Sequence, residues 1–183
     1  KAADAPLNYT VTVETLVNAP TNMASGGSRW MQVRAAVIPA MTNGEYISRP
    51  RIVVTMQLQD NKGTHMYHGL ADMWSEDFGR TWHGPTQKPT LERRYLKDGL
   101  IEVPVDTTPQ WNAANGKVLL TGATFLLSEK IDRHIPGGRS HTSYSVYEPK
   151  TDSWTEWQKL EMPDEPEFHY ARAGCSQRVD LPN

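Results

Sequence analysis

Histidine, arginine and carboxylate side chains gather in three segments of the sequence, at 60–68, 128–141 and 167–174. Five of the six histidines fall in these segments. Histidine exchanges a proton near neutral pH, and the guanidinium of arginine binds a carboxylate or sulfate through two parallel hydrogen bonds. This combination suits the binding and cleavage of an anionic sugar. The candidate catalytic residues are Asp60, His65, His68, His134, His141 and Tyr170. The candidate substrate-binding residues are Arg34, Arg133, Arg139, His169 and Arg172.

Metal chemistry is the weaker interpretation of the same histidines. The stretch "HMYH" at 65–68 could bring two imidazoles to one ion, but two histidines in a loop are a small ligand set. No cofactor is expected, and a structural calcium or zinc ion stays an open alternative. Cys175 is the single cysteine, which excludes an intrachain disulfide and a cysteine-based zinc cluster.

The composition bounds the class of protein. The chain has 183 residues, the size of one domain, with 13 glycines and 13 prolines. Its net charge is −2 and it has no block of Lys or Arg, which argues against nucleic acid as a partner. No apolar run approaches the ~20 residues of a membrane span. The N-terminus suggests a mature end after removal of a signal peptide, so we expect a secreted or periplasmic protein.

The elements that must position these residues are short strands. Segments rich in β-branched and aromatic residues are bounded by Gly, Pro and Asn, which predicts an all-β fold. They lie at 33–40, 51–59, 66–74, 117–127 and 142–149. An internal repeat is also visible between "ADMWSEDFGRTWHGP" and "SVYEPKTDSWTEWQK": an offset of 72 positions aligns Trp154 with Trp82. A four-stranded unit repeated at this interval is typical of a β-propeller blade.

The stretch "SEDFGRTW" at 75–82 matches the pattern Ser/Thr-x-Asp-x-Gly-x-Thr-Trp. Ser and Asp side chains can bond the amides of such a turn, and glycine supplies a positive φ. The stretch resembles the Asp box of the sialidase superfamily, whose fold is a β-propeller. The resemblance implies that this turn is structural rather than catalytic. The matching residues are Ser75, Asp77, Gly79, Thr81 and Trp82.

The resemblance implies a sialidase-like propeller, six-bladed when complete, of which this chain covers about two and a half four-stranded blades. Blade one is expected at about 33–90 and blade two at about 106–160, with blade three begun at about 173. The chain is then the N-terminal part of one propeller domain. Its partners would be a glycan substrate and the missing C-terminal blades, supplied by the same protein or by another chain.

Sialidases carry a Phe/Tyr-Arg-Ile-Pro motif on the first inner strand, and here "VIPA" places Val37 where the arginine should be. Arg34 lies three residues earlier and is expected on the other side of the sheet. Asp60 is the acidic residue that fits the catalytic aspartate of the family.

Three functions stay open. The first is a sialidase-like exo-glycoside hydrolase with Asp60 as general acid, acting on an anionic or decorated glycan. The second is a polysaccharide lyase in which Arg neutralises a uronate carboxylate while His and Tyr exchange protons. The third is a non-catalytic glycan-binding propeller in which Trp30 stacks on sugars. We expect Trp111, by contrast, to pack in the core.

Overall fold

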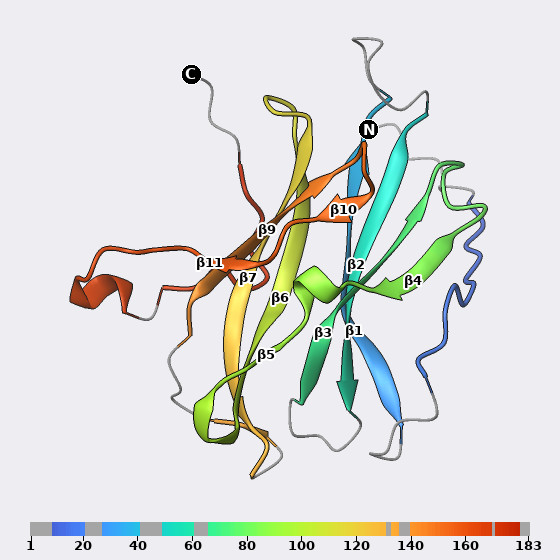
Figure 1. Ribbon diagram of the computed structural model, residues 1–183. Helices are drawn as coiled ribbons and strands as arrows, with labels where there is room; N and C mark the ends of the chain where they lie inside the picture. Colours follow the sequence, from blue (N-terminus) through green and yellow to red (C-terminus); the bar gives the residue numbers. More distant parts are fainter. Residues whose placement is uncertain are drawn as a thin grey trace, which may run out of the picture.

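The computed structural model describes residues 9–20, 27–40, 49–60, 66–130, 133–135, 140–169 and 171–179. Within them the fold is all-β, as the sequence predicts. A four-stranded antiparallel sheet has the order β1-β2-β3-β4 (Figure 1). Its strands are β1 (Ser28–Ile38), β2 (Arg51–Asp60), β3 (Tyr67–Ser75) and β4 (His83–Gln87).

The second sheet has seven strands, in the order β10-β9-β7-β6-β5, with β8 paired to β7 and β11 paired to β9. Its strands are β5 (Arg94–Tyr95), β6 (Leu100–Asn112), β7 (Lys117–Ser128), β8 (Arg133–His134), β9 (Thr142–Glu148), β10 (Ser153–Trp154) and β11 (Gln158–Lys159). Three single-turn 3-10 helices lie in the described connections: η1 (Pro89–Leu91), η2 (Lys97–Gly99) and η3 (Pro166–Phe168).

The two sheets share one plan. Their first long strands, β1 and β6, each contain a bulge with a left-handed residue, Gln32 at φ 54° and Asp106 at φ 54°. The turns after β3 and β9 each contain another, Phe78 at φ 61° and Asp152 at φ 49°. Gln32 and Asp106 are 74 residues apart in the sequence, and so are Phe78 and Asp152. Non-glycine residues seldom adopt this conformation, so its recurrence at matched positions marks a structural repeat.

The repeat does not keep the constant offset of 72 residues predicted from the sequence. The first turn is closed by the pair Trp74 and His83, and the second by the pair Glu148 and Ser153. The offset is therefore 74 residues before the turn and 70 after it, because the second turn is four residues shorter. Trp82 precedes β4, whereas Trp154 lies within β10, so the two tryptophans are not equivalent.

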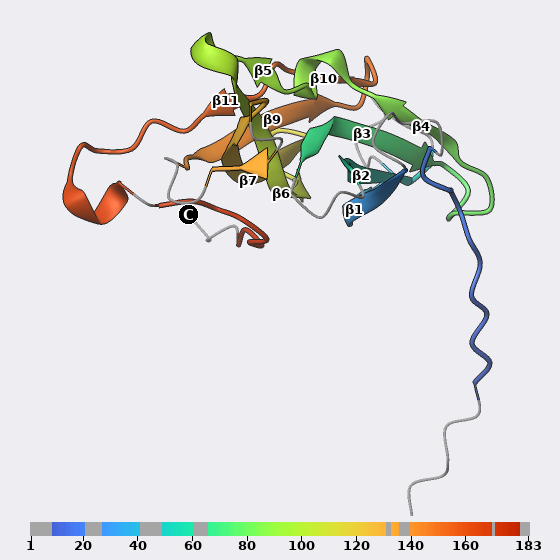
Figure 2. The same cartoon turned by 90° about the horizontal axis from the view of Figure 1, so that it is seen from below.

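The main apolar core lies between the sheets, which pack side by side (Figures 1 and 2). Ile38, Val53 and Leu70 of the first sheet meet Leu120 and Tyr147 of the second, and all five are at most 2% exposed. Strand β2 is buried on both faces. Its other face carries a second cluster, against which Val17 of the N-terminal segment packs. Trp111 packs against the main core, as expected.

Directional polar bonds also join the sheets. The carboxylate of Asp72, on β3, is 1% exposed and accepts a 2.7 Å hydrogen bond from Trp154 Nε1. Lys88 Nζ lies 3.0 Å from its other oxygen. Burial raises the pKa of Asp72, while the bonds from Trp154 and Lys88 oppose that rise. A buried carboxylate that accepts from a donor on the other sheet favours the relative position of the two sheets that keeps this bond.

We predict that Asp72→Ala lowers the free energy of unfolding by about 3 kcal/mol, because the buried indole N–H of Trp154 loses its acceptor. Asp72→Asn is the matched control: its amide oxygen can still accept from Trp154, and the loss should be smaller. Urea unfolding followed by tryptophan fluorescence measures both. Equal losses in the two variants would show that the Trp154 bond does not hold the sheets.

Candidate functional site

Two of the candidate catalytic residues form a pair at one end of the first sheet. Asp60 is the last residue of β2 and His68 is the second residue of β3. His68 Nε2 lies 2.9 Å from Asp60 Oδ1, and the two side chains are 18% and 14% exposed. A carboxylate that accepts from Nε2–H fixes the tautomer and orientation of the imidazole, and Nδ1 is then the nitrogen that can take up a proton.

A bulge in β3 brings His68 to this place. Gln57 pairs with Leu70 and Gln59 with Tyr67, so two residues of β3, His68 and Gly69, stand opposite one residue of β2. Bulges of this kind redirect a side chain. Gly69 is required here because a Cβ at this position would lie 2.6 Å from the Cα of Glu92. The glycine thus lets the connection after β4 pass directly against the bulge.

His68 faces a pocket of about 670 Å³ between the first sheet and residues 17–20. We name it the Trp30 pocket. Trp30 and Leu58, which face each other across the β1–β2 ladder, form one wall, and Gln87 of β4 forms another. Trp30 Nε1 donates to the carbonyl of Asn18 at 3.3 Å. Among the described residues that line this pocket, His68 is the one with a titratable side chain.

The turn between β3 and β4 holds the residues of the Asp-box-like stretch. Gly79 N donates to Ser75 Oγ at 2.8 Å, and Thr81 donates to Asp77 from its amide at 2.9 Å and from its hydroxyl at 2.6 Å. Trp82 Nε1 donates to the carbonyl of Gly79, whose φ is +86°. The bonds from Thr81 lower the pKa of Asp77 to about 2. All these bonds stay within the turn, which is a structural rather than a catalytic arrangement.

Arg34 lies at the meeting point of three chain segments. Its Nη1 donates to the carbonyl of Thr107 on β6 at 3.0 Å. Its Nη2 donates to Gln32 Oε1 at 2.8 Å and to Cys175 Sγ at 3.0 Å. Val37 is 56% exposed on the opposite face of β1. The guanidinium of Arg34 therefore joins β1, β6 and the segment after η3, and these contacts occupy donors that a substrate carboxylate would need.

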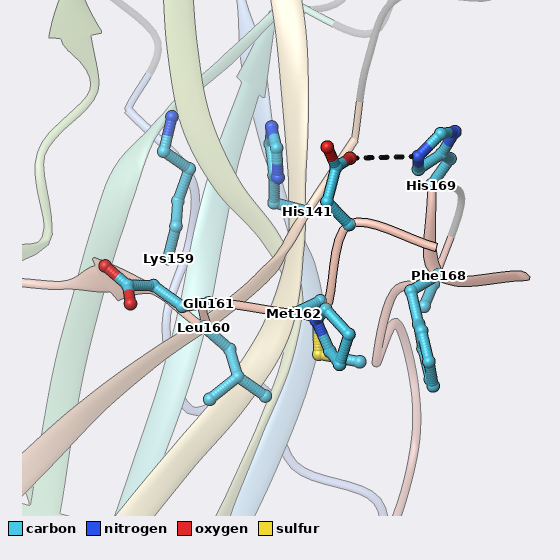
Figure 3. A pocket seen from close by; sticks show the side chains of 10 residues that line it. His141, Lys159, Leu160, Glu161, Met162, Phe168 and His169 are labelled. Atoms are coloured by element: carbon cyan, nitrogen blue, oxygen red, sulfur yellow. Dashed lines mark hydrogen bonds and ion pairs between the residues drawn. The ribbon is translucent and has the colours of Figure 1, made fainter. Parts of the chain in front are cut away.

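His141 and His169 line a different pocket of about 360 Å³, shown in Figure 3. It shares no described lining residue with the Trp30 pocket. His169 Nε2 lies 3.2 Å from Asp164 Oδ1. Arg172, three residues after His169, is exposed. The structure thus brings the candidate residues together in two separate groups rather than in one.

The remaining candidates fall outside these contacts. His65, Arg139 and Tyr170 lie outside the described residues. Arg133 and His134 form β8, whose backbone pairs with β7. The described part of the chain contains no group of three or more His, Cys, Asp or Glu side chains placed to hold a metal ion.

Sequence reasoning missed the bulge in β3 and the pocket wall contributed by Gln87. One signal was present: Gly69 interrupts an otherwise apolar strand pattern, and an isolated glycine in a strand indicates a bulge or a close backbone approach. No sequence signal indicated that residues 17–20 would cover the face that carries Trp30.

No family model, characterised protein or solved structure matches this chain. None of the helices in the described ranges is long and apolar enough to cross a membrane.

The Asp77 turn generates a prediction about acid stability. The pKa of Asp77 is about 2 in the folded chain against an ordinary value of 3.8, so its ionised form stabilises the fold above about pH 4. This contribution is lost as the pH falls toward 2. Asp77→Asn should therefore be less stable than the wild type at pH 6 and lose less stability between pH 4 and 2. Parallel pH dependences of the two unfolding midpoints would contradict the assignment.

Proposed function

We propose that this chain is part of a carbohydrate-active β-propeller of the sialidase-like type, and that the Trp30 pocket is its glycan site. The observation that carries the proposal is the hydrogen bond between His68 and Asp60 beside Trp30. Sugar rings stack on indole faces, and a histidine held by a carboxylate is suited to proton transfer. A secreted or periplasmic location, where glycans are met, belongs to the same proposal.

The repeated plan of the two sheets supports the propeller. Gln32 of β1 and Asp106 of β6 are followed by another left-handed residue, Cys175 at φ 56°, whose amide donates to the carbonyl of Asp106 at 2.9 Å. Arg178 N donates to Gln110 Oε1 further along the same strand. Residues 175–178 therefore lie along the second half of β6, and β1 also lies against β6. Three successive segments with one shared local conformation are what the inner strands of neighbouring blades would provide.

In this proposal, the side chains in and beside the Trp30 pocket have separate roles. The indole of Trp30 offers a platform for a sugar ring, and the amide of Gln87 can bond sugar hydroxyls. His68 transfers the proton, either to the oxygen of the bond being broken or from a carbon beside a carboxylate. Asp60 acts as a positioning residue that holds the imidazole and balances its charge when protonated. The pairing favours His68 over Asp60 as the group that exchanges protons with the glycan.

Hydrolysis and β-elimination differ in how this proton is used. In a sialidase-like hydrolase, protonated His68 would donate its proton to the leaving oxygen as the glycosidic C–O bond breaks. Water would add to the sugar carbon, and its proton would return to the imidazole. In a lyase, the imidazole would remove the proton α to a uronate carboxylate. The C–H electrons form a C=C bond as the C–O bond to the leaving sugar breaks, and the leaving oxygen takes the proton from the imidazolium. The histidine base with its aspartate partner is the specific observation that favours the lyase as the second candidate.

Activity on sialylated and uronate-containing oligosaccharides separates the two candidates. A hydrolase releases free sialic acid or reducing ends, and a lyase adds the ultraviolet absorbance of an unsaturated uronate. In either case we predict that His68→Gln lowers kcat about 10²–10⁴-fold. Asp60→Asn should cause a smaller loss with a displaced pH profile, and Trp30→Leu should raise KM.

The matched control is His83→Gln, an exposed histidine on β4 that stacks on Trp74 rather than lining the Trp30 pocket. Its activity should equal that of the wild type. Full activity of His68→Gln would overturn the proposal. If glycan binding depends on Trp30 but no product forms, the chain is a glycan-binding domain rather than an enzyme.

A further inference from the structure

The pocket that His141 and His169 line is not used by the proposed glycan site. We name it the Phe168 pocket. Much of its wall comes from residues 160–164, 168, 169 and 171, which follow β11 (Figure 3). This part of the chain extends from the second sheet on the side away from the N-terminal segment (Figure 2). It is an open surface pocket of about 360 Å³.

Apolar side chains form much of its lining. Leu160 is 46% exposed and Met162 is 37% exposed, and Phe168 is half-buried. Pro163 and Ala171 complete the apolar part. Exposed apolar side chains gathered around one pocket mark a surface that a partner can cover.

The charges around this pocket are mainly negative. Glu161 and Asp164 line it, and Glu165 and Glu167 follow in the same segment. Lys159 also lines it, but its Nζ lies 3.2 Å from Glu102 Oε2, so its charge is balanced within the protein. The side chain of Asp164 is 95% exposed, and its carboxylate contacts only the imidazole of His169 among the ion pairs described for it. Apart from Arg172, the segment 160–172 contains no Lys or Arg.

We propose that the Phe168 pocket binds a basic peptide segment of a partner protein. A Lys or Arg of that peptide would pair with one of the two carboxylates, Glu161 or Asp164, and its aliphatic stem would lie on the apolar side chains of the pocket. Both cations are attracted to an aromatic face as well as to carboxylates. An apolar residue of the peptide would cover Leu160. This surface acts independently of the glycan site.

The test is fluorescence anisotropy of a labelled peptide that alternates Lys and Leu, titrated with the full chain at physiological salt. We expect the Glu161→Gln/Asp164→Asn double variant to bind about five- to tenfold more weakly, since each exposed carboxylate contributes modestly. Phe168→Ser should also weaken binding. The matched control is Glu14→Gln, an exposed carboxylate on the N-terminal segment, which should bind as the wild type does.

Peptides of the same length that alternate Ser and Leu, or Glu and Leu, complete the design. Weak binding of both supports the charge complementarity. Equal binding of the Ser–Leu peptide, or unchanged binding of the Lys–Leu peptide by both the double variant and Phe168→Ser, would overturn the proposal. Circular dichroism of each variant distinguishes loss of the site from loss of the fold.

Discussion

The buried carboxylate of Asp72 joins the two sheets of the fold. It lies between two sheets and accepts the indole N–H of a tryptophan 82 residues away in the chain. Because buried polar groups need hydrogen-bond partners, this bond favours the observed position of the two sheets. Asp72 is also near the middle of β3, the strand that carries His68 near one end and Ser75 at the other. The position of β3 therefore sets both the pair with Asp60 and the turn before β4.

The connection between the sheets is fixed in the same way. Leu91 is fully buried, and Trp157 Nε1 donates to the carbonyl of Glu92 at 2.8 Å. The guanidinium of Arg94 stacks on the indole of Trp157, 3.6 Å from the ring centroid. Glu92 in turn lies against Gly69, beside His68. The second sheet thus supports the bulge that orients the imidazole, although none of its residues lines the Trp30 pocket among those described.

Much of this fold could be predicted from the sequence, because its signals are local. The β-branched run at 51–59 and the "TSYSVYE" run predicted β2 and β9, and the all-β class followed. Long-range consequences could not be predicted in this way. Nothing in the sequence around Asp72 indicated that its side chain would bond Trp154. The hydrogen bonds of Arg34 end on Thr107 and Cys175, 73 and 141 residues away. The proximity of Asp60 and His68 was expected from one shared loop, but their contact depends on a bulge that one glycine permits.

We propose that the imidazole of His68, held by Asp60, contacts a glycan in the Trp30 pocket. The most direct measurement is ¹⁵N NMR of the histidine side chains, recorded with increasing amounts of each oligosaccharide. We expect an Nε2–H tautomer of His68 that is altered in Asp60→Asn, and a change at His68 Nδ1 when the glycan that binds is added. His83 should not respond. If a glycan is bound or cleaved while the signals of His68 stay unchanged, the Trp30 pocket is not the glycan site.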